Sequence, residues 1–231
     1  MKSKSNHQDF LKIIAIILMV VDHLGVYLFP EYPIMRAIGR FIMPIFCFCA
    51  GYNFHNKPKI KILLVGIILY IFTTILFQQL TVTNILISIF LGQCYLYFLA
   101  NQLTNFFYKG YCHVIFLAVL SPMTFPFIDY GTISLSVMVL GYLAKNDQKN
   151  FKLATALSII LPFFQSFLTF HFTPFYSWIM VFIGILEYMM MVVRNFGEKI
   201  SVNLRIISHN ALYIYAIHLA IIQFIFFKLY F

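Results

Sequence analysis

The sequence predicts an all-α integral membrane protein, a polytopic bundle of about nine transmembrane helices. Composition is the first reason, because 62% of the 231 residues are hydrophobic and only 10% are charged, whereas soluble domains carry about 25% charged residues. The second reason is that apolar stretches near the ~20 residues needed to cross a bilayer recur along the chain. The third is a regular alternation of basic and non-basic connections between them.

Nine apolar segments follow one another, and no linker or water-soluble insertion is long enough for a second domain, so residues 1–231 are expected to form a single domain. The segments are residues 10–30, 34–54, 60–78, 84–102, 112–128, 131–145, 152–170, 174–193 and 205–230. The fifth and sixth are short, and Pro122 and Pro126 interrupt the fifth, so eight or ten spans remain open.

Basic residues mark every second connection between the segments. They are Lys2 and Lys4; Lys57, Lys59 and Lys61; Lys109; Lys145, Lys149 and Lys152; and Arg194, Lys199 and Arg205. By the positive-inside rule these connections face the cytoplasm, which predicts a cytoplasmic N-terminus and an external C-terminus. The net charge of +9 is therefore a topology signal, and nucleic-acid binding is not expected because no basic stripe lies on a soluble module.

Four cysteines, Cys47, Cys49, Cys94 and Cys112, lie in or beside apolar segments. They show neither CxxC nor any zinc-ligand spacing, so we expect thiols that behave as small hydrophobes and no metal site. Gln93 is a further polar residue inside an apolar segment. It either lines a cavity or hydrogen-bonds to another helix.

The stretch MVVDHLGVYLFP places Asp22 and His23 side by side inside the first apolar segment. Ionisable residues at such depth are costly and mark functional sites by default. Lys12 and His23 are eleven residues apart, about three helical turns or 16 Å, so they share one face of the helix. Asp22 lies about 100° around the helix axis from His23, so it can instead meet a cation on another segment.

Arg36 and Arg40 are the cations nearest to Asp22 in depth. They form an i, i+4 pair on one face of the second segment, close to its external end. A structural ion pair that locks the first two helices is one reading, and charge stabilisation within a site is the other. His23 likewise either hydrogen-bonds across helices or acts as a functional base.

The ninth segment contains SHNALYIYAIHLA. His209 and His218 are nine residues apart and point to opposite faces of one helix, so at most one of them shares a site with His23, and His218 is the deeper. Asn210 and Tyr215 add polar tips, which serve either the site or interfacial packing.

These residues give the chain a resemblance to the TraX family of integral membrane proteins, whose named member is associated with N-terminal acetylation of conjugative F pilin. The likeness covers nearly the whole chain: LKIIAIILMVVDHLG, RAIGRFIMPIFCFCAGY, NILISIFLG, DYG and ALYIYAIH. The sequence has CAGY where the family's second block carries an acidic residue. A more distant similarity is to the transmembrane acyltransferase superfamily of the acyltransferase-3 and heparan-glucosaminide acetyltransferase types, in which a basic residue precedes a histidine by ten intervening residues, as Lys12 precedes His23.

The resemblance implies a multi-pass acyltransferase of the bacterial inner membrane. It would move an acetyl group from cytoplasmic acetyl-CoA to an amine or hydroxyl acceptor on the external side, such as a pilin-like N-terminus, a glycan or an envelope polymer. The implied roles are donor binding for Lys12, base catalysis for His23 with Asp22, and charge stabilisation for Arg36, Arg40, His218, Tyr215 and Asn210. Direct transfer and an acyl-histidine intermediate are both open, as is a homodimer.

Two other functions remain open from the sequence. A small secondary transporter would use Asp22, His23, Arg36 and Arg40 as a relay, although no internal repeat is detectable in the chain. A non-catalytic assembly factor for an envelope machine would use the same charges for structure alone.

The charge alternation yields a topology prediction. In single-cysteine variants probed with a membrane-impermeant thiol reagent, positions 57–61 and 145–152 should be protected in intact cells, whereas Glu31 and Phe231 should be labelled. Labelling of Phe231 only after the membrane is opened would contradict the nine-span arrangement.

Overall fold

Helices form the regular elements of the described chain, as the sequence predicts. The computed structural model describes residues 7–39, 42–55, 57–78, 83–102, 106–124, 126–146 and 204–230. The helices are α1 (His7–Tyr27), α2 (Pro33–Gly39), α3 (Ile42–Tyr52), α4 (Ile60–Phe77), α5 (Ile85–Gln102), α6 (Phe106–Thr124), α7 (Ile133–Asn146), α10 (Arg205–His209) and α11 (Ala211–Tyr230). An isolated parallel bridge joins Thr83 and Ile128.

Four stretches are long and apolar enough to cross a membrane: Gln8–Tyr27, Ile60–Phe77, Ala211–Leu229, and Pro33–Tyr52, which comprises α2 and α3 and includes positions 40 and 41, outside the described residues. Shorter apolar helices cover Ile85–Ala100, Cys112–Ser121 and Ile133–Asn146. The helical membrane fold is thus confirmed. The count of nine spans and the sides on which the termini lie stay predictions, and the seventh and eighth predicted spans, 152–170 and 174–193, lie outside the described residues.

The ninth predicted span is not one helix, which corrects the sequence analysis. It is divided at Asn210 into α10 and α11. The Asn210 amide Nδ2 donates to the Ile206 carbonyl at 2.9 Å, and the Asn210 backbone N–H bonds to the carbonyls of Ile206 and Ile207. Asparagine competes well for local backbone groups, which favours a helix break at this position. The predicted fifth span also shifts, since α6 ends at Thr124, before Pro126.

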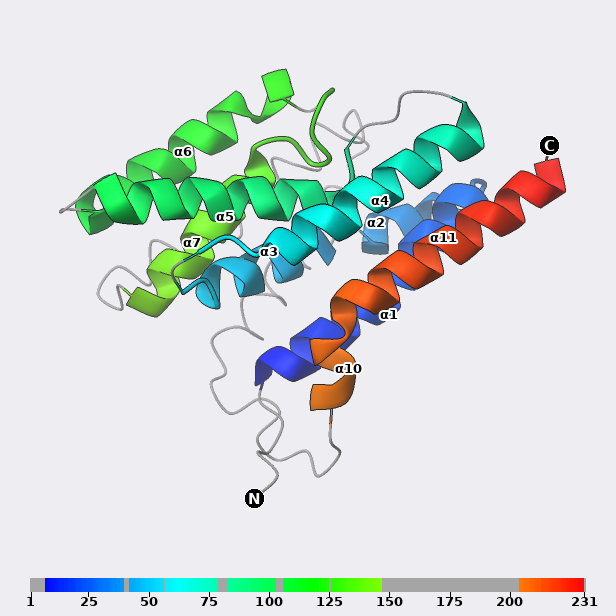
Figure 1. Ribbon diagram of the computed structural model, residues 1–231, viewed down its shortest axis with the longest axis horizontal. Coiled ribbons are helices and arrows are strands. Elements are labelled where there is room, and N and C mark those ends of the chain that lie inside the picture. Colours follow the sequence, from blue (N-terminus) through cyan, green and yellow to red (C-terminus); the bar gives the residue numbers. More distant parts are fainter. Residues whose placement is uncertain are drawn as a thin grey trace.

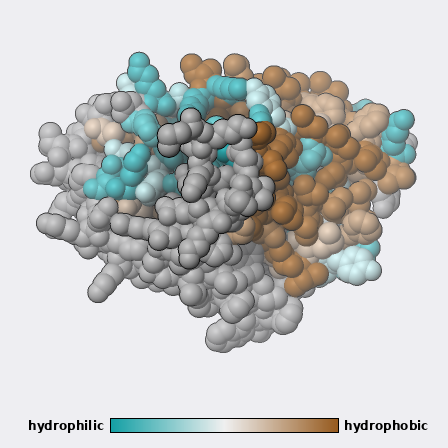
Figure 2. All heavy atoms as spheres, turned by 90° about the horizontal axis from the view of Figure 1, so that it is seen from below, coloured by the Kyte–Doolittle hydropathy of each residue, from teal (hydrophilic) through white to brown (hydrophobic). Residues whose placement is uncertain are grey.

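Helix α11 lies alongside α1, so the first and last parts of the chain pack together, with α4 against α11 (Figure 1). Apolar side chains cover much of one half of the face seen in Figure 2. Exposed isoleucines, leucines and phenylalanines recur along α4 and α11, among them Ile68, Ile75, Ile217 and Leu229. Such an apolar exterior suits contact with lipid acyl chains.

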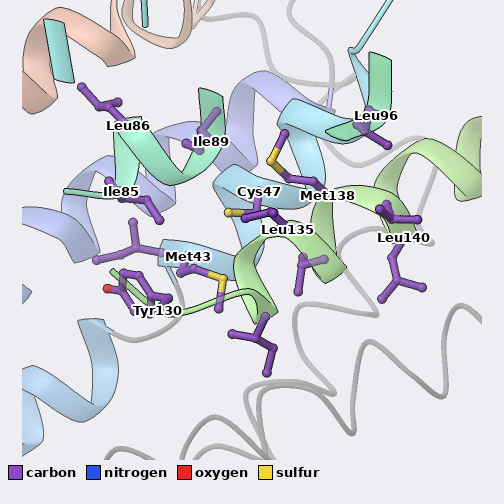
Figure 3. Close-up of a cluster of buried hydrophobic side chains, with 14 of the residues drawn as sticks. Met43, Cys47, Ile85, Leu86, Ile89, Leu96, Tyr130, Leu135, Met138 and Leu140 are labelled. Atoms are coloured by element: carbon purple, nitrogen blue, oxygen red, sulfur yellow. The ribbon is translucent and has the colours of Figure 1, made fainter. Parts of the chain in front are cut away.

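The core lies between α3, α5 and α7 (Figure 3). Met43 and Cys47 of α3 face Ile85 and Ile89 of α5 and Met138 of α7 in one cluster of buried side chains. Cys47 and Cys49 are buried free thiols, whereas Cys112 is an exposed one. The predicted small-hydrophobe role therefore fits the two cysteines of α3.

Helices α3 and α7 approach each other backbone to backbone through two glycines. A Cβ atom at Gly51 would collide with the Met138 carbonyl, and one at Gly141 would collide with the Phe48 carbonyl. Small residues allow such close approach in membrane bundles, where packing rather than water exclusion drives helix association.

Gly51→Ala should therefore destabilise the bundle by about 3 kcal/mol, because the clashing partner is backbone and cannot rotate away. The measurement is the thermal unfolding midpoint and the monodisperse yield in detergent. Gly66→Ala is the milder control, since its new Cβ would lie 3.0–3.3 Å from side-chain atoms of Ile87, Leu86 and Asn84, which a shift of a few tenths of an ångström relieves. Equal stability of the Gly51→Ala variant and the wild type would contradict the close packing of α3 on α7.

Candidate functional site

His23 of α1 meets His218 of α11, and both residues are half-buried. His23 Nδ1 lies 2.7 Å from His218 Nε2. The two rings are stacked, with centroids 4.9 Å apart and planes inclined by 20°. The structure thus brings together two residues that the sequence analysis placed in one site, and it selects His218 over His209 as the partner.

The hydrogen bonds of the pair define its tautomers. His218 Nδ1 lies 2.7 Å from the Ile214 carbonyl, which only accepts, so Nδ1 carries a proton. In a neutral His218 the lone pair is then on Nε2, and His23 Nδ1 is the N–H that donates to it. A neutral His23 consequently carries its own lone pair on Nε2. This is the arrangement of a histidine base held in one tautomer by a second group.

Tyr215 joins the histidine pair to a large cavity. Its ring makes edge contacts with His23, at a centroid distance of 5.9 Å, and with His218, at 5.8 Å. Tyr215 itself is among the residues that line the cavity. Its hydroxyl has no hydrogen-bond partner within the described part of the chain.

The cavity has a volume of about 910 Å³ and runs from a polar end to an apolar end. The lining residues at the polar end are Gln8, Asp9 and Lys12 of α1, Asn53 just after α3, Gln93 of α5, and Arg205 and Ser208 of α10. Those at the apolar end are Met19 of α1, Ile42 and Phe46 of α3, Ile85, Leu86 and Ile89 of α5, and Leu212 and Tyr215 of α11. Met19, Ile42, Ile85 and Tyr215 belong to one buried cluster, which makes their end of the cavity apolar. From Gln8 to Met19, α1 rises about 16 Å.

The polar end of the cavity is basic. Lys12, Lys57, Lys59 and Arg205 line it, from α1, the α3–α4 connection and α10. Asp9 also lies there, but it is buried and accepts a short hydrogen bond from the Ser208 hydroxyl. Four cations from three parts of the fold suit a ligand with several negative charges. In the sequence, Lys57, Lys59 and Arg205 indicate topology alone, and their position beside Lys12 follows from the fold.

Asp22 pairs with Arg36 rather than with the histidines. Arg36 Nη1 donates to Asp22 Oδ1 at 2.7 Å, with 5% of the Asp22 side chain exposed and 28% of that of Arg36. A Cβ at Gly39 would collide with the Asp22 side chain, so glycine lets α2 approach the carboxylate. The ion pair therefore fastens α1 to α2, as one of the two readings of the sequence expects. Arg40 lies outside the described residues.

The remaining candidates lie farther from the histidine pair. Asn210 is exposed at the junction of α10 and α11, where its side chain bonds to the Ile206 carbonyl. His209 is exposed at the polar end of the cavity and bonds to the Arg205 carbonyl. Within the described ranges, no three His, Cys, Asp or Glu side chains are grouped to hold a metal ion.

The structure shows two polar networks that the sequence did not predict. Gln223 of α11, 2% exposed, donates to the Tyr27 hydroxyl at 2.8 Å and accepts from Thr73 of α4 at 3.0 Å. The amides of Gln8 and Asn53 meet at the cavity. Polar residues in apolar helices are the sequence signal for such networks, but their partners lie far along the chain.

The fold and site define a helical membrane protein with a histidine pair beside a cavity that is basic at one end. The chain belongs to the TraX family: the family model described as "TraX protein" matches residues 7–226. It is 45% identical, over 97% of this chain and 94% of the relative, to the uncharacterized protein RP591 of Rickettsia prowazekii (strain Madrid E). No solved structure matches it.

The ion pair yields a prediction for stability. Asp22→Asn should cost about 3 kcal/mol and lower the folded yield in detergent, because Arg36 is left without its carboxylate in the bundle. The double variant Asp22→Asn with Arg36→Gln should recover part of the loss, since neither charge is then uncompensated. Losses that simply add in the double variant would show that the two side chains are not coupled.

Proposed function

We propose that this protein is a membrane acyltransferase that uses an acyl-CoA donor, with acetyl-CoA as the expected donor, and His23 as the general base. The observation that carries the proposal is the His23–His218 pair and its position beside the cavity. The pair contacts Tyr215, Tyr215 lines the apolar end of the cavity, and the other end of the cavity is basic. A polyanionic donor with a long arm fits this polarity: its phosphates suit Lys12 and the neighbouring cations, and its thioester suits the apolar end.

The proposed chemical step needs few groups. An acceptor amine attacks the thioester carbon while His23 Nε2 removes its proton; the carbon–sulfur bond then breaks, and the thiolate takes that proton from His23. Tyr215, which lines the cavity, would donate its O–H to the thioester carbonyl oxygen as negative charge develops there. His218 holds the His23 ring by accepting from Nδ1, so it acts as a positioning residue.

The acceptor is proposed to be an amine or hydroxyl group that arrives from the external side of the bacterial inner membrane. An α-amino group has a reference pKa of about 7.7–8.0, so a histidine base suits it better than it suits an alcohol. A pilin-like N-terminus is one such acceptor, and a glycan or an envelope polymer is another. An acyl-histidine on His23 is an alternative route with the same residues.

The arrangement of charges favours an enzyme over a relay transporter. A relay through Asp22, His23 and Arg36 requires these groups to communicate, but Asp22 faces Arg36 on α2 whereas His23 faces His218 on α11. The ion pair thus holds α1 against α2 beside the site.

His23→Ala should lower kcat for acyl transfer by about 10²–10⁴-fold, the usual contribution of a positioned base. The measurement is transfer from labelled acetyl-CoA to a panel of amines by purified protein, with monodispersity checked in parallel. His113→Ala is the matched control, because His113 bonds to Tyr95 between α5 and α6 and does not line the cavity. Wild-type turnover by the His23→Ala variant would refute the mechanism.

Lys12→Ala should act on the donor instead. It removes one phosphate contact far from the reacting carbon, so KM for acetyl-CoA should rise about tenfold while kcat changes little. Steady-state kinetics at varied donor concentration separate the two parameters. A selective fall in kcat would place Lys12 at the chemical step and contradict its assignment to the donor's phosphates.

A further inference from the structure

Three carboxamide side chains line the polar end of the cavity beside the cations. Gln8 comes from α1, Asn53 follows the last residue of α3, and Gln93 comes from α5. Gln93 is only 4% exposed as a residue, and it lines the cavity wall. A buried amide is costly unless its hydrogen-bonding groups are satisfied, which makes the partners of these three side chains informative.

The hydrogen bonds within the described chain use only part of their capacity. Gln93 Oε1 accepts from the Lys59 backbone N–H at 2.8 Å, which leaves the two N–H donors of Nε2. Asn53 Nδ2 donates to Gln8 Oε1 at 2.9 Å and to the Cys49 carbonyl at 2.8 Å, so both of its hydrogens are used. In the part of the chain that the structure describes, the N–H donors of Gln8 and Gln93 and the acceptor Oδ1 of Asn53 remain available for further hydrogen bonds.

This remainder matches a ligand that carries secondary amides. Each secondary amide offers a carbonyl acceptor and an N–H donor, the complement of the glutamine donors and of Asn53 Oδ1. An anionic phospholipid, which also has a charged head and an apolar end, offers ester and phosphate oxygens but no amide N–H for Asn53. Hydrogen-bonding sites discriminate strongly, because a ligand that lacks the group leaves a buried partner unsatisfied.

We propose that Gln8, Asn53 and Gln93 form a carboxamide collar that recognises the amide groups of a pantetheine-type arm. Such a collar would select donors that are pantetheine thioesters with a polyanionic head, and it would discriminate against anionic lipids, which carry no amide groups. The assignment rests on the proposed function in one respect, namely that the arm leads from the basic end toward Tyr215 and His23.

The test compares two ligands by isothermal titration calorimetry on the purified full-length protein. Coenzyme A carries both the head and the arm, whereas adenosine 3′,5′-bisphosphate carries part of the head and no arm. Gln93→Met and Gln8→Met should each weaken coenzyme A binding about tenfold, the loss expected for one or two buried hydrogen bonds, and leave the affinity for the bisphosphate unchanged. Gln8 is included because, unlike Gln93, it makes no bond to Lys59.

Gln223→Met is the matched control. Gln223 is a similarly buried glutamine, but its partners are Tyr27 and Thr73 and it does not line the cavity, so coenzyme A affinity should not change. Equal losses for both ligands in the two collar variants, or no loss for coenzyme A, would overturn the collar. A lipid site would also overturn the collar: phosphatidylglycerol in nanodiscs would then displace coenzyme A, and the Gln8→Met substitution would not change this competition. The expected losses in a protein that transfers no acyl group would support the collar and refute the proposed function.

Discussion

The organising constraint of this fold is that ionisable side chains inside an apolar helix must find partners on other helices. Helix α1 meets this constraint three times: Asp9 bonds to Ser208 of α10, Asp22 to Arg36 of α2 and His23 to His218 of α11. Each contact fixes a different neighbour: that of Asp9 lies near the start of α1, and those of Asp22 and His23 lie side by side deeper along it. The last part of the chain is thereby held against the first, and the cavity wall that α10 and α11 supply follows from that closure.

The cavity derives its polarity from helices whose sequences change character along their length. Polar groups gather where α1 and α10 begin, and apolar groups gather about three turns further along α1 and at the start of α11. A ligand bound there has its charged part and its apolar part separated by the helix rise of about 16 Å between Gln8 and Met19. In the proposed mechanism His23 lies beside this apolar end, in contact with Tyr215 of the cavity wall, and hydrogen bonds and charges act more strongly where little water is present.

Sequence periodicity and hydropathy predict the helical membrane class, the pairing of Asp22 with an arginine of the second segment, and the choice of His218 as the deeper histidine. They fail where the outcome depends on local competition or on distant partners. Asn210 divides a continuous apolar segment because its side chain captures a backbone carbonyl. The meeting of Gln93 with Lys59, and of Lys12 with Arg205 in one cavity, depends on packing between segments that hydropathy treats separately.

The central claim is that an acyl group passes from a donor at the basic end of the cavity to an acceptor on the other side of the membrane. Sealed proteoliposomes that enclose an amine acceptor test this claim directly when labelled acetyl-CoA is added only outside. The account predicts label on the enclosed amine, at a rate that depends on the protein and saturates with acetyl-CoA. Label that stays on coenzyme A, or that reaches only amines on the donor's own side, would contradict it.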